Sequence, residues 1–300
     1  MSTSTINRVT GLLVIEVVNS NPNGNPDQES DPRVRSNGHG EISPVSFKRK
    51  VRDLIEWKDG PVYHHAMENL TDVPDGYQFE ILESRGRNRT AITAELNEGQ
   101  VDGKFSQEAF LQSPFVKKYW DARLFGNTFL EDGGEKGFIK TGIVQVGMGL
   151  SVCPVVIQRQ TNTNKAGVEE GKNGGMAPLA YRVVEHGVYV MPFFINPSLA
   201  SHSGCKPCDV EVLKRVIPFA YEHTRSAIRP DVRIRHAWWM EHNSPLGSCP
   251  DYKLIDALTP KRKGDDSFAP SASWADYDVP VALPDDLKAK IKCVDLMENC

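Results

Sequence analysis

The chain has 300 residues, of which 39% are apolar and 25% are charged, and its formal net charge is −4. This composition is typical of a globular protein with one large or two ordinary domains, and the acidic balance excludes a uniformly basic nucleic-acid-binding protein. No apolar run approaches the ~20 residues of a membrane-spanning helix, and the N-terminal MSTSTINR has no apolar signal core. We therefore expect a cytoplasmic protein with no membrane partner.

Residues 8–57 hold the most informative pattern. A run of Val, Leu and Ile at 8–18 predicts a strand central to a sheet. Residues 19–42 are rich in Asn, Pro, Gly and Asp and predict a long loop, and long ordered loops are usually functional. Ser43 or Ser46 then caps a helix. The apolar stripe of that helix, which should face the core, is Phe47, Val51, Leu54 and Ile55.

Cations crowd the first turns of this helix, at Lys48, Arg49, Lys50 and Arg52. Positive charge at a helix N-terminus opposes the macrodipole, so a fold tolerates it more readily when an anion binds there. Free N–H groups, the dipole and the cations would then all favour phosphate. The alternative is a solvated basic face on an ordinary helix, and spacing alone does not decide between the two.

The loop carries amides and acids with two possible uses. Asn19, Asn21 and Asn23 can hydrogen-bond bases and phosphates, or they can satisfy the backbone of a purely structural loop. Asp27 and Asp31 could act catalytically, for instance by aiding attack of a ribose 2′-hydroxyl. No His–acid pair accompanies them in the sequence, so acids that balance the nearby cations are the favoured interpretation.

The middle of the chain predicts an insertion and a hairpin. Residues 58–115 are polar and weakly patterned, as small helices and loops are. Residues 138–159 and 181–195 have the composition of strands, and the Gly/Asn/Thr-rich segment 160–180 between them predicts a hairpin that projects from the sheet. Met176, near its tip, could wedge between bases or dock on a neighbouring subunit, or it could be incidental in a disordered loop.

The last part of the chain completes an α+β pattern. Residues 208–223 predict the clearest helix, with a kink at Pro218, and 231–242 alternate like a half-exposed strand. Beyond 243 we expect a loop-rich tail with a short helix near 284–291. These elements favour an antiparallel sheet with two packing helices. A ferredoxin-like core is the economical candidate, and such sheets often bind single-stranded RNA.

The six cysteines are scattered, which fits a reducing compartment better than a disulfide framework. Cys205 and Cys208 form a CKPC pair that His202 and Cys249 could complete as a zinc site. A turn with two thiols is the favoured interpretation, so we expect no metal and no cofactor. The sequence also has no P-loop, GxGxxG, HExxH or GxSxG motif, and we assign no catalytic residue.

The loop and helix pattern NxNPNGNPD, DPRV and SPVSFKRKVR resembles the backbone subunit of type I CRISPR Cascade surveillance complexes. This is the Cas-seven family of the RAMP superfamily, and the pattern is closest to its subtype I-C form. The resemblance covers most of residues 8–240. It continues in DARLFG (121–126), TGIVQ and SVCPV (141–155), EHGVYV (185–190) and EHTRSA (222–227).

The resemblance implies a fold and a set of partners. The fold is a modified RNA-recognition-motif palm over residues 1–243, with a finger insertion at 58–118, a thumb hairpin at 156–182 and a loop-rich C-terminal extension at 244–300. Copies assemble head to tail along the crRNA without catalysis and support pairing of the guide with target DNA in antiviral defence. Other Cascade subunits and a recruited helicase-nuclease are the further partners.

The resemblance also implies residue roles. Lys48, Arg49 and Arg52 would contact guide phosphates. Asn21, Asn23 and Arg33 of the loop would flank them. The full predicted RNA-binding set is Asn19, Asn21, Asn23, Arg33, Ser46, Lys48, Arg49, Lys50, Arg52, Gln145, Lys165 and Met176. The alternative is a target-RNA endoribonuclease, like the related backbone subunits of type III complexes, in which a loop aspartate such as Asp31 is catalytic.

Overall fold

The fold is that of a computed structural model, which describes residues 5–84, Thr90, Ala94, 111–126, 141–165, 176–264 and 268–299, without the side chains of 162–165, 176–180 and 299. Within these ranges, no helix is both long and apolar enough to cross a membrane.

One large antiparallel sheet organises the molecule, in the order β12-β9-β1-β8-β6-β4. β5 and β7 also pair with β8. The predicted mixture of helices with a large antiparallel sheet is confirmed. The strands are β1 (Val9–Ser20), β4 (His39–Ile42), β5 (Val144–Val146), β6 (Gly149–Pro154), β7 (Ile157–Lys165), β8 (Met176–Ile195), β9 (Val232–His242) and β12 (Ile291–Asp295).

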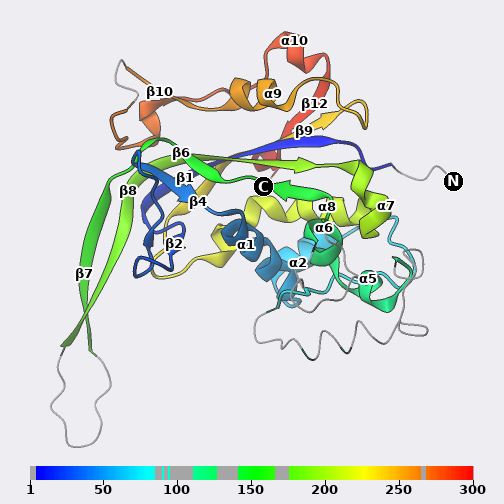
Figure 1. The fold of residues 1–300 in the computed structure, drawn as a ribbon, viewed down its shortest axis with the longest axis horizontal. Helices are drawn as coiled ribbons and strands as arrows, with labels where there is room; N and C mark the ends of the chain where they lie inside the picture. The colour runs from blue at the N-terminus through cyan, green and yellow to red at the C-terminus, as the bar shows by residue number, and fades with distance from the viewer. Residues whose placement is uncertain are drawn as a thin grey trace, which may run out of the picture.

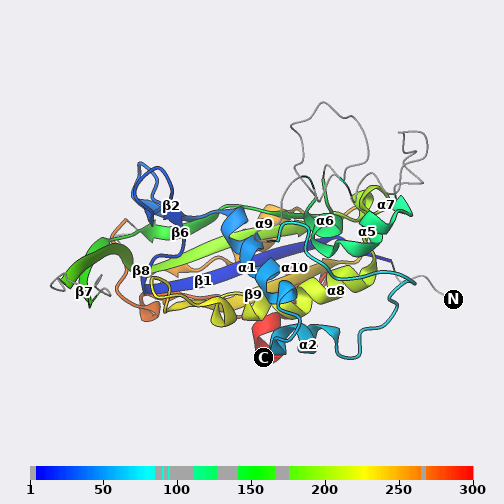
Figure 2. The same cartoon turned by 90° about the horizontal axis from the view of Figure 1, so that it is seen from below.

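β1 is buried at nearly every position because both faces of the sheet are covered (Figure 1). Leu13 and Ile15 belong to a core with helices α1 (Pro44–Glu56) and α8 (Pro207–Val216). Leu12 and Val14 belong to a second core with the C-terminal segment, which contains α9 (Asp251–Leu258) and α10 (Asp285–Lys288). Figure 2 shows α1 and α8 lying across the first face. The second face is therefore closed to bases that would stack on it.

The predicted helix after the loop is confirmed together with its cap. The Ser43 hydroxyl accepts a hydrogen bond from the Ser46 N–H at 3.2 Å, and Pro44 occupies the first helical position. The predicted stripe of Phe47, Val51, Leu54 and Ile55 is buried. The later helix α8 is shorter than predicted. It ends at Val216, and Pro218 lies in a 3₁₀ turn, η2 (Ile217–Phe219), because proline cannot donate the next helical hydrogen bond.

Between α1 and β5 the described residues form α2 (Pro61–Met67), α5 (Pro114–Lys118) and α6 (Trp120–Phe125). Arg123 of α6 donates to both carboxylate oxygens of Asp209 on α8, at 3.0 and 2.7 Å, and both side chains are fully buried. Burial opposes the charge of Arg123, but Asp209 outweighs it and raises the pKa of the guanidinium. Arg123, in the DARLFG segment, therefore fastens α6 to α8.

The C-terminal segment is more structured than predicted. β12 pairs with β9 from Ile291↔His242 to Asp295↔Trp238. The short helix expected near 284–291 is α10, but α9 and β12 gave no clear signal in the sequence. The remaining elements are β2 (Gly24–Asn25), β3 (Asp31–Pro32), β10 (Lys261–Arg262), β11 (Tyr277–Asp278), α7 (Ala200–Ser203) and the 3₁₀ turns η1 (Pro197–Leu199), η3 (Glu222–Thr224), η4 (Trp274–Asp276) and η5 (Leu296–Asn299).

β7 and the first half of β8 pair antiparallel from Ile157↔Val184 to Lys165↔Met176. In Figure 1 this two-stranded arm extends away from the rest of the sheet. Residues 166–175, between the two strands, lie outside the described residues.

Candidate nucleic-acid interface

The connection from β1 to α1, residues 21–43, consists of a loop and the strand β4, and amides of the loop hold it at the end of β1. Asn21 is 2% exposed, and its side-chain N–H donates to the Ser30 carbonyl at 2.7 Å. Its backbone N–H donates to the Ile228 carbonyl at 2.8 Å. Gly24 permits the tight return of the loop, because a Cβ there would lie 2.9 Å from the Ser30 carbonyl oxygen. Asn21 therefore fixes the shape of the loop from inside.

Asn23 connects the loop to the start of α1. Its Oδ1 accepts the Ser43 N–H at 2.6 Å, and its carbonyl accepts the Arg33 N–H at 3.0 Å. The first turn of α1 lies open to the outside, since Val45 is 71% exposed there. The loop and the helix N-terminus thus form one continuous surface, which we call the β1–α1 surface.

Three of the four helix cations have protein partners, which corrects the expectation that the cluster is free for an anion. Arg49 forms ion pairs with Asp53 and Glu56, each at 2.7 Å. Arg52 is 4% exposed and lies 2.8 Å from Asp121 of α6.

Lys50 is also buried, and its ammonium donates to the Thr224 hydroxyl at 2.9 Å. It lies 5.3 Å from the centre of the Tyr221 ring. Two of the predicted phosphate ligands, Lys50 and Arg52, therefore face into the protein.

Lys48 and Arg33 are the predicted cations that remain for an anion. Lys48 lies 5.1 Å from the centre of the Phe125 ring, and burial together with the neighbouring Arg52 lowers its pKa. Among the described residues, neither Lys48 nor Arg33 has a carboxylate within ion-pair distance. The Arg33 Nε is buried and has no hydrogen-bond partner in the same part of the chain. A buried donor without an acceptor costs free energy.

The structure adds arginines that sequence reasoning missed. Segment 225–231 wraps the end of β1, where the Arg229 Nε donates to the Asn21 carbonyl at 2.9 Å and Arg225 is exposed. Arg182 of β8 forms an ion pair with Asp31 of the loop. The EHTRSA motif, which contains Arg225, was the sequence signal for the first of these segments. Arg229 and Arg182 lie outside that motif.

The other predicted residues are dispersed. Asn19 is exposed at the end of β1 with a positive φ of 42°. Gln145 donates to the Gly142 carbonyl at 2.7 Å and lines a hollow of about 560 Å³ with Arg8 and Asp251. Its strand partner Phe194 also pairs with Thr10, so Gln145 lies at the opposite end of β1, about 33 Å from the loop. The side chains of Lys165 and Met176 lie outside the described residues.

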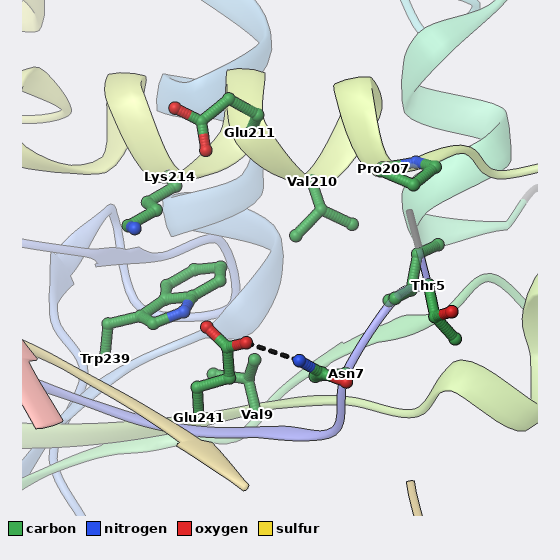
Figure 3. Close-up of a pocket in the computed structure, with 10 residues that line it drawn as sticks. Thr5, Asn7, Val9, Pro207, Val210, Glu211, Lys214, Trp239 and Glu241 are labelled. Carbon is green, nitrogen blue, oxygen red and sulfur yellow. Dashed lines mark hydrogen bonds between the residues drawn. The ribbon is translucent and has the colours of Figure 1, made fainter. Parts of the chain in front are cut away.

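A second hollow, of about 180 Å³, lies between the N-terminal segment, α8 and β9 (Figure 3). Lys214 lies 5.8 Å from the centre of the Trp239 ring, and Glu211 and Glu241 also line the space. Glu241 accepts the Asn7 side-chain N–H at 2.5 Å. Two carboxylates against one ammonium make this hollow a poor place for phosphate.

The CKPC thiols are buried. Burial raises the pKa of Cys205 and raises that of Cys208 to about 12, with Asp209 adding to the effect in both. Within the described ranges, no three His, Cys, Asp or Glu side chains are grouped as metal ligands would be.

Known proteins similar to this chain include a curated protein and chains of solved complexes. A curated protein from Haloferax volcanii, described as CRISPR-associated protein Cas7, is 26% identical over 137 residues, which are 44% of this chain and only 35% of that protein. Two chains from solved structures are each 14% identical to this chain. The first, from a "CRISPR RNA-guided surveillance complex, pre-nicking", has a TM-score of 0.44 over 78% of both chains. The second, from a "CRISPR RNA-guided surveillance complex", has a TM-score of 0.39 over 85% of this chain and 76% of that one.

The family comparison covers far more of the sequence. The model of the family described as CRISPR-associated protein Cas7 matches residues 7–282, which include every element from β1 to the last turns before α10. The chain belongs to the CRISPR-associated protein Cas7 family.

Proposed function

We propose that this chain is a guide-RNA-binding backbone subunit of a type I CRISPR surveillance complex. The observation that carries the proposal is the β1–α1 surface of a member of the Cas7 family, to which the loop contributes Arg33 and α1 contributes Lys48 and an open first turn. Cations and the positive end of a helix dipole together favour phosphate. Membership of the family supports the guide RNA of a CRISPR complex as the source of that phosphate.

The topology supports an RNA-recognition-type palm. The chain runs β1, α1, β6, β8, α8, β9, and these strands lie side by side in the order β9-β1-β8-β6. A ferredoxin-like core has this succession of strands and helices. Because the C-terminal segment covers one sheet face and the helices cover the other, we propose that the RNA runs past the end of β1 rather than over the sheet.

The residues of the β1–α1 surface divide into two roles in this proposal. Lys48 and Arg33 contact phosphates, and Asn19 and Ser46 lie at the edges of the contact. Asn21 and Asn23 position the loop through their hydrogen bonds to Ser30 and Ser43. In the same way, Arg49, Lys50 and Arg52 position α1 rather than touch RNA.

Copies of the chain would assemble head to tail along the crRNA, since a heterologous contact generates an open filament. The arm of β7 and β8 would act as the thumb, with Lys165 and Met176 reaching the guide. Target DNA is then read by pairing with the guide, so the protein needs only backbone and shape contacts. Other subunits of the complex and a recruited helicase-nuclease complete the proposed partners.

We assign the chain no catalytic residue. Asp31, the acid favoured by the endoribonuclease alternative, is engaged in an ion pair with Arg182. Asp27 is exposed, and its backbone N–H donates to the Asn25 side-chain oxygen at 3.2 Å within the loop. This arrangement supports a binding role for the loop.

Titrating the full-length chain into labelled single-stranded RNA and into a DNA duplex of the same sequence tests the proposal. We expect tight, salt-dependent binding of the RNA and weaker binding of the duplex. Lys48→Gln with Arg33→Gln should weaken RNA binding, while Lys261→Gln, an exposed cation of β10, should not. If the wild type, the double variant and Lys261→Gln bind RNA equally, the β1–α1 surface does not bind RNA. If the wild type binds no RNA, the proposed function is wrong.

A further inference from the structure

Two arginines face each other directly across the arm. In the register of β7 and β8, Arg159 pairs with Arg182. Directly opposed residues of an antiparallel pair lie on the same face with Cβ atoms about 5 Å apart, and like charges in that position destabilise the pair. Both side chains are exposed. A negative charge between the two guanidinium groups would offset this repulsion.

The pair lies on the helix side of the sheet. Arg182 precedes Val184 by two residues on the same strand, and alternation puts both side chains on one face. Val184 is fully buried in the core that contains Phe47 and Val51 of α1. The arginine pair therefore continues the face on which the β1–α1 surface lies, at the base of the arm.

Asp31 of the loop supplies one negative charge at this place. Its carboxylate forms an ion pair with Arg182, and its side chain is 20% exposed whereas that of Arg182 is 52% exposed. In the described part of the chain, Arg159 has no carboxylate within ion-pair distance. Asp31 thus pairs with only one of the two arginines, and these three side chains together keep a net positive charge.

We propose that Arg159 and Arg182 together bind one backbone phosphate of nucleic acid, and that Asp31 occupies this position while no nucleic acid is bound. The inference rests on the proposed function, because it adds a site on the arm to the RNA surface. A phosphate offers more acceptor oxygens than a carboxylate and is a preferred partner of the planar guanidinium fork. Exchange of Asp31 for phosphate would satisfy both arginines at once.

The phosphate can come from the guide RNA or from a target strand paired with it, and two binding measurements separate these sources. The first titrates the full chain with single-stranded RNA over a series of salt concentrations. The second titrates the RNA-loaded particle with complementary DNA over the same series. Each phosphate contact to a single strand contributes about 0.7 to the slope of log affinity against log salt.

Arg159→Gln should lower one of the two slopes by about 0.7 and weaken that step about fivefold, as the loss of one exposed charge contact does. Asp31→Asn should strengthen the same step by a similar factor because it removes the competing carboxylate. Asp27→Asn is the matched control, since it removes an exposed charge of the same loop that is not paired with Arg182. In an Arg159→Gln, Arg182→Gln background, Asp31→Asn should have no effect, because contacting residues are not additive.

Unchanged slopes for Arg159→Gln in both measurements would overturn the phosphate site. If Asp31→Asn and Asp27→Asn raised the affinity equally, the proposal that Asp31 occupies the phosphate position would be overturned. In either case, wild-type RNA binding would leave the proposed function intact, whereas its absence would count against the proposed function itself. Arg159 is exposed and Asp31→Asn is isosteric, so melting temperatures close to wild type should accompany all these variants.

Discussion

The Nε of Arg52 lies 2.8 Å from Oδ2 of Asp121, with side chains 5% and 1% exposed. Asp121 also accepts the Leu82 N–H at 2.7 Å. One buried carboxylate thus joins α1, the segment after α2 and the start of α6. Arg52, which we expected from the sequence to contact RNA, is instead part of the frame that holds the β1–α1 surface.

Arg52→Ala should therefore destabilise the protein. It leaves Asp121 buried without its guanidinium, and breaking one partner of a buried pair costs about 3–5 kcal/mol. Urea unfolding of the two proteins measures the change in the free energy of unfolding. Arg225→Ala, at an exposed arginine, is the control and should change it by less than about 0.5 kcal/mol. A loss confined to RNA affinity, with stability unchanged, would contradict the structural role.

Lys48 and Arg49 are neighbours in sequence but should respond differently to removal of charge. Lys48→Gln should lower the salt slope of RNA binding by about 0.7. Arg49→Gln should lower it much less, because Asp53 and Glu56 already neutralise Arg49. Affinities measured by fluorescence anisotropy at several salt concentrations give both slopes. Equal slopes for the two variants would mean that Arg49 contacts RNA despite its ion pairs with Asp53 and Glu56.

Asp295 should contribute to stability in a pH-dependent way. Burial raises its pKa, but hydrogen bonds from His236 at 2.6 Å and from the Ala237 and Met297 N–H groups outweigh burial, and the net pKa is lowered. A lowered acid pKa stabilises the folded state above the unfolded value of about 3.9, and this contribution is lost as pH falls through the folded value.

Asp295→Asn should accordingly cost about 1–3 kcal/mol at pH 7, because polar groups at the β9–β12 junction lose a charged partner. The cost should shrink as pH falls below about 4. Urea midpoints of both proteins at a series of pH values provide the comparison. A constant difference across the series would show that the charge of Asp295 is not what stabilises the junction.

The CKPC pair should behave as two protected thiols. Burial raises the pKa of Cys205 and Cys208, so both remain protonated and shielded near neutral pH. We expect slow reaction with a thiol reagent in buffer and full reaction in denaturant, and a chelator should leave the melting temperature unchanged. Stoichiometric zinc in the purified protein, lost together with stability on chelation, would contradict this expectation.

Local sequence pattern was sufficient to predict the elements that position the β1–α1 surface. The apolar run of β1 identified a central strand because both faces of that strand are covered. Ser43 identified the start of α1 because its hydroxyl caps the first turn. The spacing of Phe47, Val51 and Leu54 gave the buried face of α1. These features depend on neighbours within a few residues, which a sequence displays directly.

The partners of the charged residues could not be read in this way. Arg52 meets Asp121, and Lys50 meets Thr224, across 69 and 174 residues of sequence. Asp31 meets Arg182 across 151 residues. Helical spacing places Arg52 off the apolar stripe, yet another part of the chain covers that side of α1. The second core was missed for the same reason, because its C-terminal half has weak periodicity and its strand β12 depends on β9.

The central claim is that this chain coats a guide RNA. Its most direct test is to express the full chain with its neighbouring genes and a CRISPR repeat array, purify the particle and sequence the RNA that remains bound. The account predicts discrete RNA of guide length carrying repeat-derived ends, in a particle with several copies of the chain. A monomer free of nucleic acid, purified in the presence of the array, would contradict it.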